Sequence, residues 1–155
     1  MSSPGRLLGV DYGAVRIGLA VSDPDRKIAS PLATYTRGSR TQDAQYFRDL
    51  VAQEQIVQLV VGLPIHLSGH EGQSSGQARA FGKWLGEVTG LPLLFWDERF
   101  TTVEAEDHLL SAGLTNKRRK ARRDRVAAQI LLQSYLDAGC PGEAEQRDLH
   151  LGEEE

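Results

Sequence analysis

Residues 7–23 read LLGVDYGAVRIGLAVSD, and this stretch decides the fold. Two apolar runs, Leu7–Asp11 and Arg16–Ser22, flank a tight turn at Gly13, a pattern that predicts a β-hairpin. The turn-forming segment Asp23-Pro24-Asp25 follows, and Ala29–Tyr35 is expected to add a third strand.

Beyond the hairpin, the hydrophobic pattern alternates between helical and strand periods. We expect first a helix capped by Thr41, with Ala44, Phe47, Leu50 and Val51 on its inner face, and then a central strand, Ile56–Val61. A long loop, Gly62–Gly76, leads to a helix that ends at Gly90, with Ala78, Phe81, Leu85 and Val88 on its inner face, and to a strand, Leu91–Trp96. Two helices complete the expected pattern: one opened by a capping box at Thr101 and Glu104, and a last one from about Asp124 to Ala138. A hairpin followed by this alternation predicts an α/β fold with a mixed sheet flanked by helices.

Length and composition favour one domain over residues 1–140, followed by an acidic tail, 141–155, with too few apolar residues to pack. The net charge of −3 argues against a general nucleic-acid coat protein. A single cysteine, Cys140, fits a reducing compartment. No signal peptide and no apolar run of the ~20 residues that cross a membrane are evident. We therefore expect a cytoplasmic chain without a membrane partner.

Three acidic residues stand where strands end or a helix begins: Asp11, Glu98 and Asp124. Each has a structural alternative. Asp11 can hydrogen-bond its own turn, Asp97 can take the place of Glu98, and Asp124 can serve as a helix N-cap. Against the last alternative, Asp124 shares a helical stripe with Ala127, Ala128, Leu131 and Tyr135, which favours a side chain that points toward the strand ends.

Converging carboxylates require a cation. Two of them ~4 Å apart repel by about 4 kcal/mol at a typical effective dielectric. A divalent ion removes that cost, and hard oxygen ligands suit Mg²⁺ or Mn²⁺. The three acids are thus predicted to be both catalytic residues and metal ligands, for phosphodiester chemistry.

Basic residues adjoin two of these acids. The run before Asp124 is expected to neutralise phosphates, although the alternative is a solvated loop, and it comprises Lys117, Arg118, Arg119, Lys120, Arg122 and Arg123. Arg16 and Arg99 are also assigned to nucleic-acid binding, with a simple carboxylate ion pair as their alternative. Trp84 and Trp96 occupy core-like positions and are expected to pack rather than to stack on bases.

Four segments resemble the YqgF/RuvX family of pre-16S rRNA nucleases, also described as Holliday-junction-resolvase-like. They occur in family order and read GVDYGAVRIGLAVSD (9–23), VVGLPIHLSGHEG (60–72), DERFTT (97–102) and DRVAAQILLQSYLD (124–137). The resemblance implies an RNase H-like fold with a mixed five-stranded sheet flanked by helices. It also implies an acidic metal site at Asp11, Glu98 and Asp124, which favours Glu98 over Asp97.

The function that this resemblance implies is metal-dependent hydrolysis in 5′-end processing of precursor 16S ribosomal RNA, as part of ribosome biogenesis. Expected partners are that RNA and ribosomal particles, bound by a monomer or homodimer. One alternative is a dimeric resolvase acting on four-way branched DNA. A non-catalytic RNA-binding factor is the other alternative.

Overall fold

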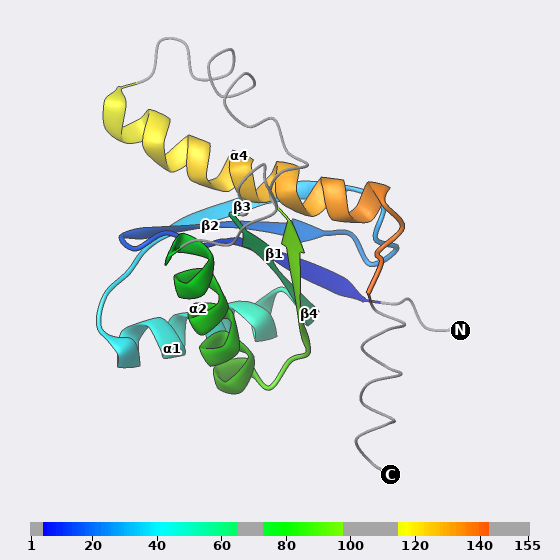
Figure 1. Cartoon of the computed structure of the whole chain (residues 1–155), viewed down its shortest axis with the longest axis horizontal. Coiled ribbons are helices and arrows are strands. Elements are labelled where there is room, and N and C mark those ends of the chain that lie inside the picture. The colour runs from blue at the N-terminus through cyan, green and yellow to red at the C-terminus, as the bar shows by residue number, and fades with distance from the viewer. Residues whose placement is uncertain (1–4, 65–72, 98–114, 143–155) are drawn as a thin grey trace.

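A mixed five-stranded sheet forms the centre of the computed structural model, which describes residues 5–64, 73–97 and 115–142 (Figure 1). The strands are β1 (Arg6–Asp11), β2 (Arg16–Ser22), β3 (Ala29–Thr36), β4 (Ile56–Leu63) and β5 (Leu93–Asp97). Their order across the sheet is β3-β2-β1-β4-β5. The pairs β1–β2 and β2–β3 are antiparallel, whereas β1–β4 and β4–β5 are parallel. The predicted mixed sheet is confirmed.

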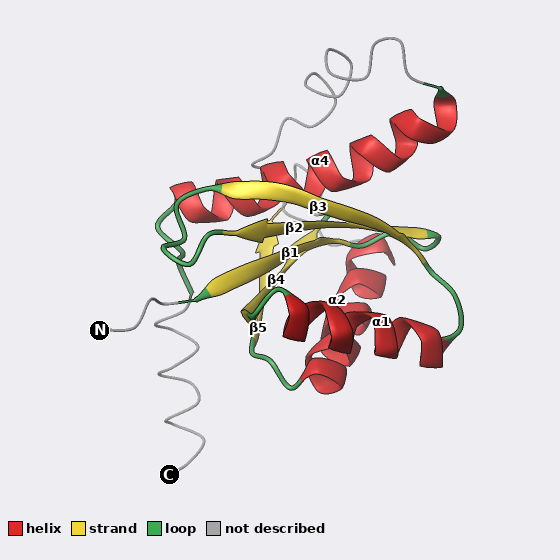
Figure 2. Cartoon of the chain, turned by 180° about the vertical axis from the view of Figure 1, so that it is seen from behind, coloured by secondary structure: helices red, strands yellow, loops and turns green. Residues whose placement is uncertain are grey.

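Helices cover both faces of this sheet (Figure 2). Helices α1 (Arg40–Gln53) and α2 (Gln73–Thr89) lie on one face, and α4 (Asn116–Asp137) crosses the other. Alternate side chains of β1 therefore enter different cores. Leu8 and Val10 belong to the core on the α1–α2 face, and Leu7 belongs to the core beneath α4. The continuous apolar run of β4 is explained in the same way, because both of its faces are covered.

The start of α1 differs from the prediction. Ser39, rather than Thr41, is the N-cap, because its extended backbone lets the hydroxyl accept the N–H of Gln42 while the Gln42 side chain accepts the N–H of Ser39. Phe47 is buried as expected, but the second buried residue of the helix is Asp43. The inner face of α1 is thus partly polar.

The predicted loop over Gly62–Gly76 is shorter than expected at both ends. Strand β4 continues through Leu63, and α2 begins at Gln73. In α2, Ala78, Phe81 and Leu85 are buried, as their helical spacing predicted. Residues 65–72 and the helix predicted from Thr101 lie outside the described residues. Within the described residues, no helix has the length and apolarity that crossing a bilayer requires.

Candidate active site

Asp11 is the last residue of β1, at the edge of the sheet where the parallel strands β1, β4 and β5 end. Strand alternation places it on the same side as Leu7 and Gly9, which is the side covered by α4. The carboxylate is half-buried. Across the hairpin, its partner in the antiparallel register is Gly18.

Helix α4 brings Asp124 to this same place. An added methyl group at Gly18 would collide with the carbonyl oxygen of Asp124, and one at Gly9 would lie 2.9 Å from Leu132 Cβ. The two glycines thus let the helix backbone lie directly on the hairpin. Because Gly18 pairs with Asp11 and touches Asp124, the two acids come from neighbouring points on one face.

Within the described residues, the carboxylate of Asp124 is contacted by Arg16. Its Nε donates to Asp124 Oδ2 at 2.8 Å, and the two side chains are 34% and 23% exposed. Arg16 thus pairs with a carboxylate, but with one that is distant in sequence rather than with Asp11. A half-exposed pair of this kind contributes about 0–1 kcal/mol to stability, so its main effect is to orient the carboxylate.

The last residues of β5 bear on the choice between Asp97 and Glu98. Leu94 and Trp96 pack beneath α4, and Trp96 Nε1 donates to Ser134 Oγ at 3.2 Å. Alternation therefore assigns Asp97, the final strand residue, to the opposite side from Asp11 and Asp124. Glu98 and Arg99 lie outside the described residues. Among the residues that are described, no three His, Cys, Asp or Glu side chains gather as a metal site would require.

The basic run before Asp124 is helical, which corrects the predicted start of the last helix. Helix α4 begins at Asn116, with the Thr115 hydroxyl accepting the N–H of Arg118 as N-cap. Asp124 is therefore in the helix interior and is not a cap. The predicted inward stripe is confirmed for Ala128, Leu131 and Tyr135, which are buried.

The basic side chains consequently project from the first turns of α4, which rise away from the sheet (Figure 2). Residues 117–120 and Arg123 are exposed, whereas Arg122 is half-buried. The Thr34 hydroxyl donates to the carbonyl of Ala121 and attaches the helix to β3 just after the exposed turns. Lysine and arginine favour helices, so the charges did not prevent this extension.

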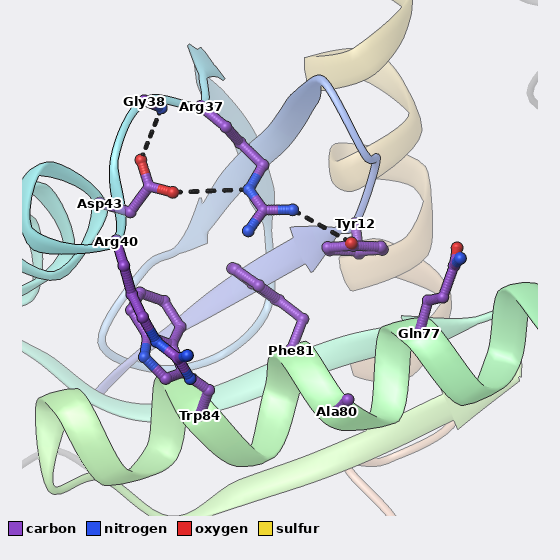
Figure 3. A pocket seen from close by; sticks show the side chains of 9 residues that line it. All are labelled: Tyr12, Arg37, Gly38, Arg40, Asp43, Gln77, Ala80, Phe81 and Trp84. Atoms are coloured by element: carbon purple, nitrogen blue, oxygen red, sulfur yellow. Dashed lines mark hydrogen bonds and ion pairs between the residues drawn. The ribbon is translucent and has the colours of Figure 1, made fainter.

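On the other face, a pocket of about 380 Å³ lies close to the end of β1 (Figure 3). It is bordered by Tyr12, which follows Asp11 directly, by Arg37 and Arg40 before and in α1, and by Phe81 and Trp84 of α2. Sequence reasoning did not identify this pocket. Its residues come from three separate segments, and the signal available, an Arg-x-x-Arg spacing before a helix, is common on solvated surfaces.

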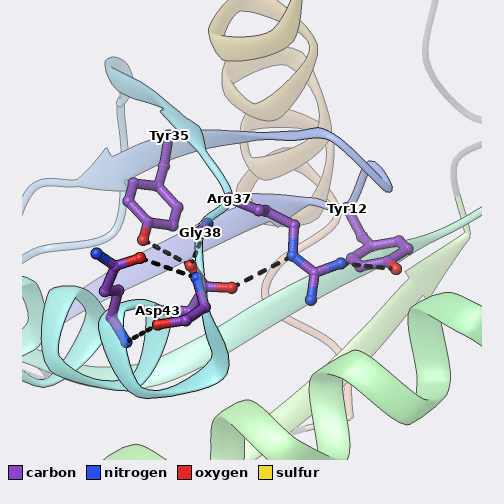
Figure 4. Close-up of polar contacts among 7 residues, drawn as sticks. Tyr12, Tyr35, Arg37, Gly38 and Asp43 are labelled. Carbon is purple, nitrogen blue, oxygen red and sulfur yellow. Dashed lines mark hydrogen bonds and ion pairs between the residues drawn. The ribbon is translucent and has the colours of Figure 1, made fainter.

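Asp43 organises one wall of the pocket (Figure 4). This carboxylate is 1% exposed, yet its Oδ1 accepts the Tyr35 hydroxyl at 2.6 Å and the Gly38 N–H at 2.9 Å. Its Oδ2 lies 3.5 Å from Arg37 Nε. A buried charge needs such partners, and here Oδ1 accepts two hydrogen bonds while Oδ2 faces the Arg37 guanidinium as an ion pair. Burial, followed by the hydrogen bond to Asp43, raises the pKa of Tyr35 to about 12.

Comparison with known proteins places these features in a family. Residues 5–138 match the family model described as "RuvX: Holliday junction resolvase". A protein of Rhodopirellula baltica named "Putative pre-16S rRNA nuclease" is 52% identical over 134 residues, which cover 86% of this chain and 78% of that protein. A protein of the same name from Protochlamydia amoebophila is 40% identical over 144 residues, covering 88% of this chain and 96% of the relative.

Solved structures agree on the fold. RuvC of T. thermophilus in complex with a Holliday junction substrate superposes with a TM-score of 0.54 at 15% identity, covering 86% of this chain and 96% of RuvC. The fowlpox virus resolvase gives 0.52 at 12% identity, with 86% and 97% covered. The predicted RNase H-like architecture is therefore confirmed by its likeness to RuvC. The family match over residues 5–138, together with relatives that are 52% and 40% identical, establishes that the chain belongs to the RuvX family.

Proposed function

We propose that this chain is a metal-dependent nuclease that hydrolyses phosphodiester bonds in precursor 16S ribosomal RNA during 5′-end processing. The observation that carries the proposal is that Asp11 and Asp124 lie at neighbouring positions on one face of the sheet, beside the carboxyl end of β1. Ligand sites of open α/β sheets form at such ends. The names of the two relatives support the choice of RNA.

The donor atoms fit a hard divalent cation. Asp11 and Asp124 supply carboxylate oxygens, and in the proposal Glu98 supplies the third carboxylate. Of the two oxygens of Asp124, Oδ2 accepts from Arg16, and Oδ1 has no protein donor within the described residues. Mg²⁺ or Mn²⁺ would use such oxygens. When bound, the metal supplies activation of water and charge stabilisation for phosphodiester hydrolysis.

The protein's own contribution is to hold the RNA and orient the acids. Arg16 fixes the rotamer of Asp124 through its 2.8 Å contact, and the close packing of α4 on Gly18 fixes the backbone that carries it. The exposed cations on the first turns of α4 continue directly from Asp124 along the helix. They would neutralise backbone phosphates on either side of the cleaved bond, as we also propose for Arg16 and Arg99 once the strand is bound.

The test is cleavage of a 5′-labelled RNA that carries a 16S precursor leader, in the presence of Mn²⁺. Asp124→Asn should slow cleavage by more than the ~10–100-fold typical for groups that only support a metal ligand. Asp97→Asn is the matched control, because this acid is assigned to the other side of the sheet and should keep cleavage near the wild-type rate. Equal cutting by wild type and Asp124→Asn would contradict the proposal, as would loss of activity on substitution of Asp97 but not of Glu98.

The description of the family model favours a second candidate, resolution of four-way DNA junctions. Symmetric cutting of a junction requires two active sites related by a two-fold axis, so this function demands a dimer. Light scattering of the chain with and without junction DNA separates the candidates. A monomer in both conditions, together with cleavage of the RNA leader, would support the RNA function alone.

A further inference from the structure

We propose that the pocket between β1, the β3–α1 connection and α2 binds one nucleotide unit, with its base against Trp84 and its phosphate between Arg37 and Arg40. The inference rests on the proposed nuclease function, since it assigns the pocket to a nucleotide of the single-stranded RNA substrate. A cavity of about 380 Å³ lies within the ~300–1,000 Å³ usual for small-molecule sites.

Arg37 is held in place as a binding group rather than left as a flexible surface cation. Its Nε faces Asp43, its Nη1 donates to the Tyr12 hydroxyl at 3.1 Å, and its guanidinium lies 5.4 Å from the centres of the Tyr12 and Phe81 rings. The Nη2 group makes no hydrogen bond within the described residues, and Arg37 lines the pocket (Figure 3). A guanidinium fixed in this manner loses little entropy when it binds an anion.

The charge of the pocket favours a phosphate. Arg37 and Arg40 are its cationic lining residues, and Asp43 is its acidic one. Both oxygens of Asp43 are engaged and the residue is buried, so the carboxylate does not present itself to a ligand. An anion in the pocket would therefore meet arginine donors rather than acidic oxygens.

Aromatic rings supply the second half of the site. Phe81 lies between the other two rings, with centroids 4.9 Å from Tyr12 and 5.5 Å from Trp84. Trp84 is half-buried, and the guanidinium of the exposed Arg40 lies 5.9 Å above its ring (Figure 3). A base can take that stacking position while Arg40 turns to the phosphate, because bases stack on tryptophan irrespective of sequence. Gln77 at the rim carries both a donor and an acceptor for a base edge.

The position of the pocket links it to the acids. Asp11 and Tyr12 are consecutive, and they serve opposite sides of the same strand end. A strand of RNA that leaves its nucleotide beside Tyr12 needs only to pass the Gly13–Val15 turn to reach the side of Asp11 and Asp124. The pocket would thus anchor the substrate a short distance from the bond to be cut.

The experiment uses Trp96→Phe as background, which leaves Trp84 as the sole tryptophan of the chain. Hexa-adenylate RNA is titrated in EDTA, so that no cleavage occurs, and Trp84 fluorescence is followed. We expect quenching, with Kd raised about tenfold or more by Arg40→Gln because a charge-assisted hydrogen bond to the phosphate is removed. Arg48→Gln is the matched control, because it removes the same charge from an exposed position of α1 outside the pocket, and Kd should change by less than about twofold.

Quenching by hexa-adenylate much tighter than by AMP supports an RNA strand as the ligand, and equal affinity for the two supports a free nucleotide in the same pocket. Absence of quenching, or equal weakening by Arg40→Gln and Arg48→Gln, overturns the inference. The two proposals fail separately. If a folded chain shows quenching but cuts no RNA, the nucleotide pocket stands and the nuclease proposal fails. If it cuts RNA without quenching, the nuclease proposal stands and the pocket inference fails.

Discussion

At the scale of single residues, Tyr35 carries a measurable consequence of burial. Burial disfavours the phenolate, and ionisation would also place a second negative charge beside the buried Asp43 carboxylate, to which the hydroxyl donates. The pKa of Tyr35 is raised from 10.0 to about 12. The stability that this raised pKa contributes is fully present below pH ~10 and is lost as the pH rises through about 12.

We therefore expect the free energy of unfolding to fall between pH 10 and 12, and to fall less in Tyr35→Phe, which cannot ionise there. Urea unfolding at pH 9 and pH 11, followed by circular dichroism, measures the difference. Tyr12→Phe is the control, because it removes another tyrosine hydroxyl, the one that accepts from Arg37 Nη1, but leaves Tyr35 able to ionise. Identical pH dependence in wild type and Tyr35→Phe would contradict the assignment.

At the scale of elements, the contact between α4 and the hairpin depends on glycine. Gly18→Ala places a methyl group against the Asp124 carbonyl, which is backbone and cannot turn aside. We expect the free energy of unfolding to fall by about 1–3 kcal/mol, the usual cost of overpacking, and RNA cleavage to fall with it because Asp124 is displaced.

Gly86→Ala is the companion to this variant. Its methyl group would lie 3.5 Å from Leu93 Cδ2, an ordinary contact, and alanine favours the helical backbone of α2. The free energy of unfolding should stay the same or rise by up to about 1 kcal/mol. Chemical denaturation of both variants tests the pair, and equal destabilisation would show that space above Gly18 is not the limiting factor.

The exposed first turns of α4 permit a separate prediction about RNA binding. Arg118→Ala combined with Lys120→Ala should lower affinity and reduce the salt slope by about 0.7 for each phosphate that the helix no longer neutralises. Arg48→Ala combined with Lys83→Ala removes two exposed cations elsewhere and should leave the slope unchanged. Filter binding over a range of KCl concentrations provides the slopes. If both double variants flatten the slope equally, net charge rather than α4 governs binding.

These elements also show where sequence reasoning was sufficient. The pattern of apolar residues in the sequence identified the hairpin, the central strand and the inward stripe of α4, because strand alternation and helical spacing are local signals. Helix starts were less predictable. Ser39 competed with Thr41, and Thr115 began α4 ahead of the charges that suggested a loop. The position of Asp124 near the strand ends was predicted both from its helical stripe and from the family resemblance, whereas the Arg37–Asp43 pocket depends on long-range packing that leaves no local periodicity.

At the scale of the whole molecule, one sheet joins two hydrophobic cores. Trp84 packs in the core on the α1–α2 face, and Trp96 packs against Tyr135 beneath α4, with ring centroids 5.3 Å apart. Strands β1, β2, β4 and β5 contribute side chains to both cores. Loss of either core would therefore expose apolar strands of the other, which favours a single cooperative transition.

The two tryptophans test this cooperativity. We expect Trp84→Phe and Trp96→Phe, each reporting from the face of its remaining tryptophan, to show unfolding by fluorescence at the same urea concentration as by circular dichroism. The fluorescence midpoint of each variant is compared with the circular dichroism midpoint of that same variant, so a general change in stability does not affect the comparison. Fluorescence and circular dichroism midpoints that separate in either variant would mean that the two faces unfold independently.

The opposite orientation of Asp11 and Tyr12 has a consequence for evolution. Insertion or deletion of one residue in β1 would exchange the two faces, sending the acid into the α1–α2 core and the aromatic ring beneath α4. Substitutions in this strand can be accommodated one at a time, but changes in its length cannot. Length polymorphism among descendants of this gene should therefore accumulate outside residues 7–22.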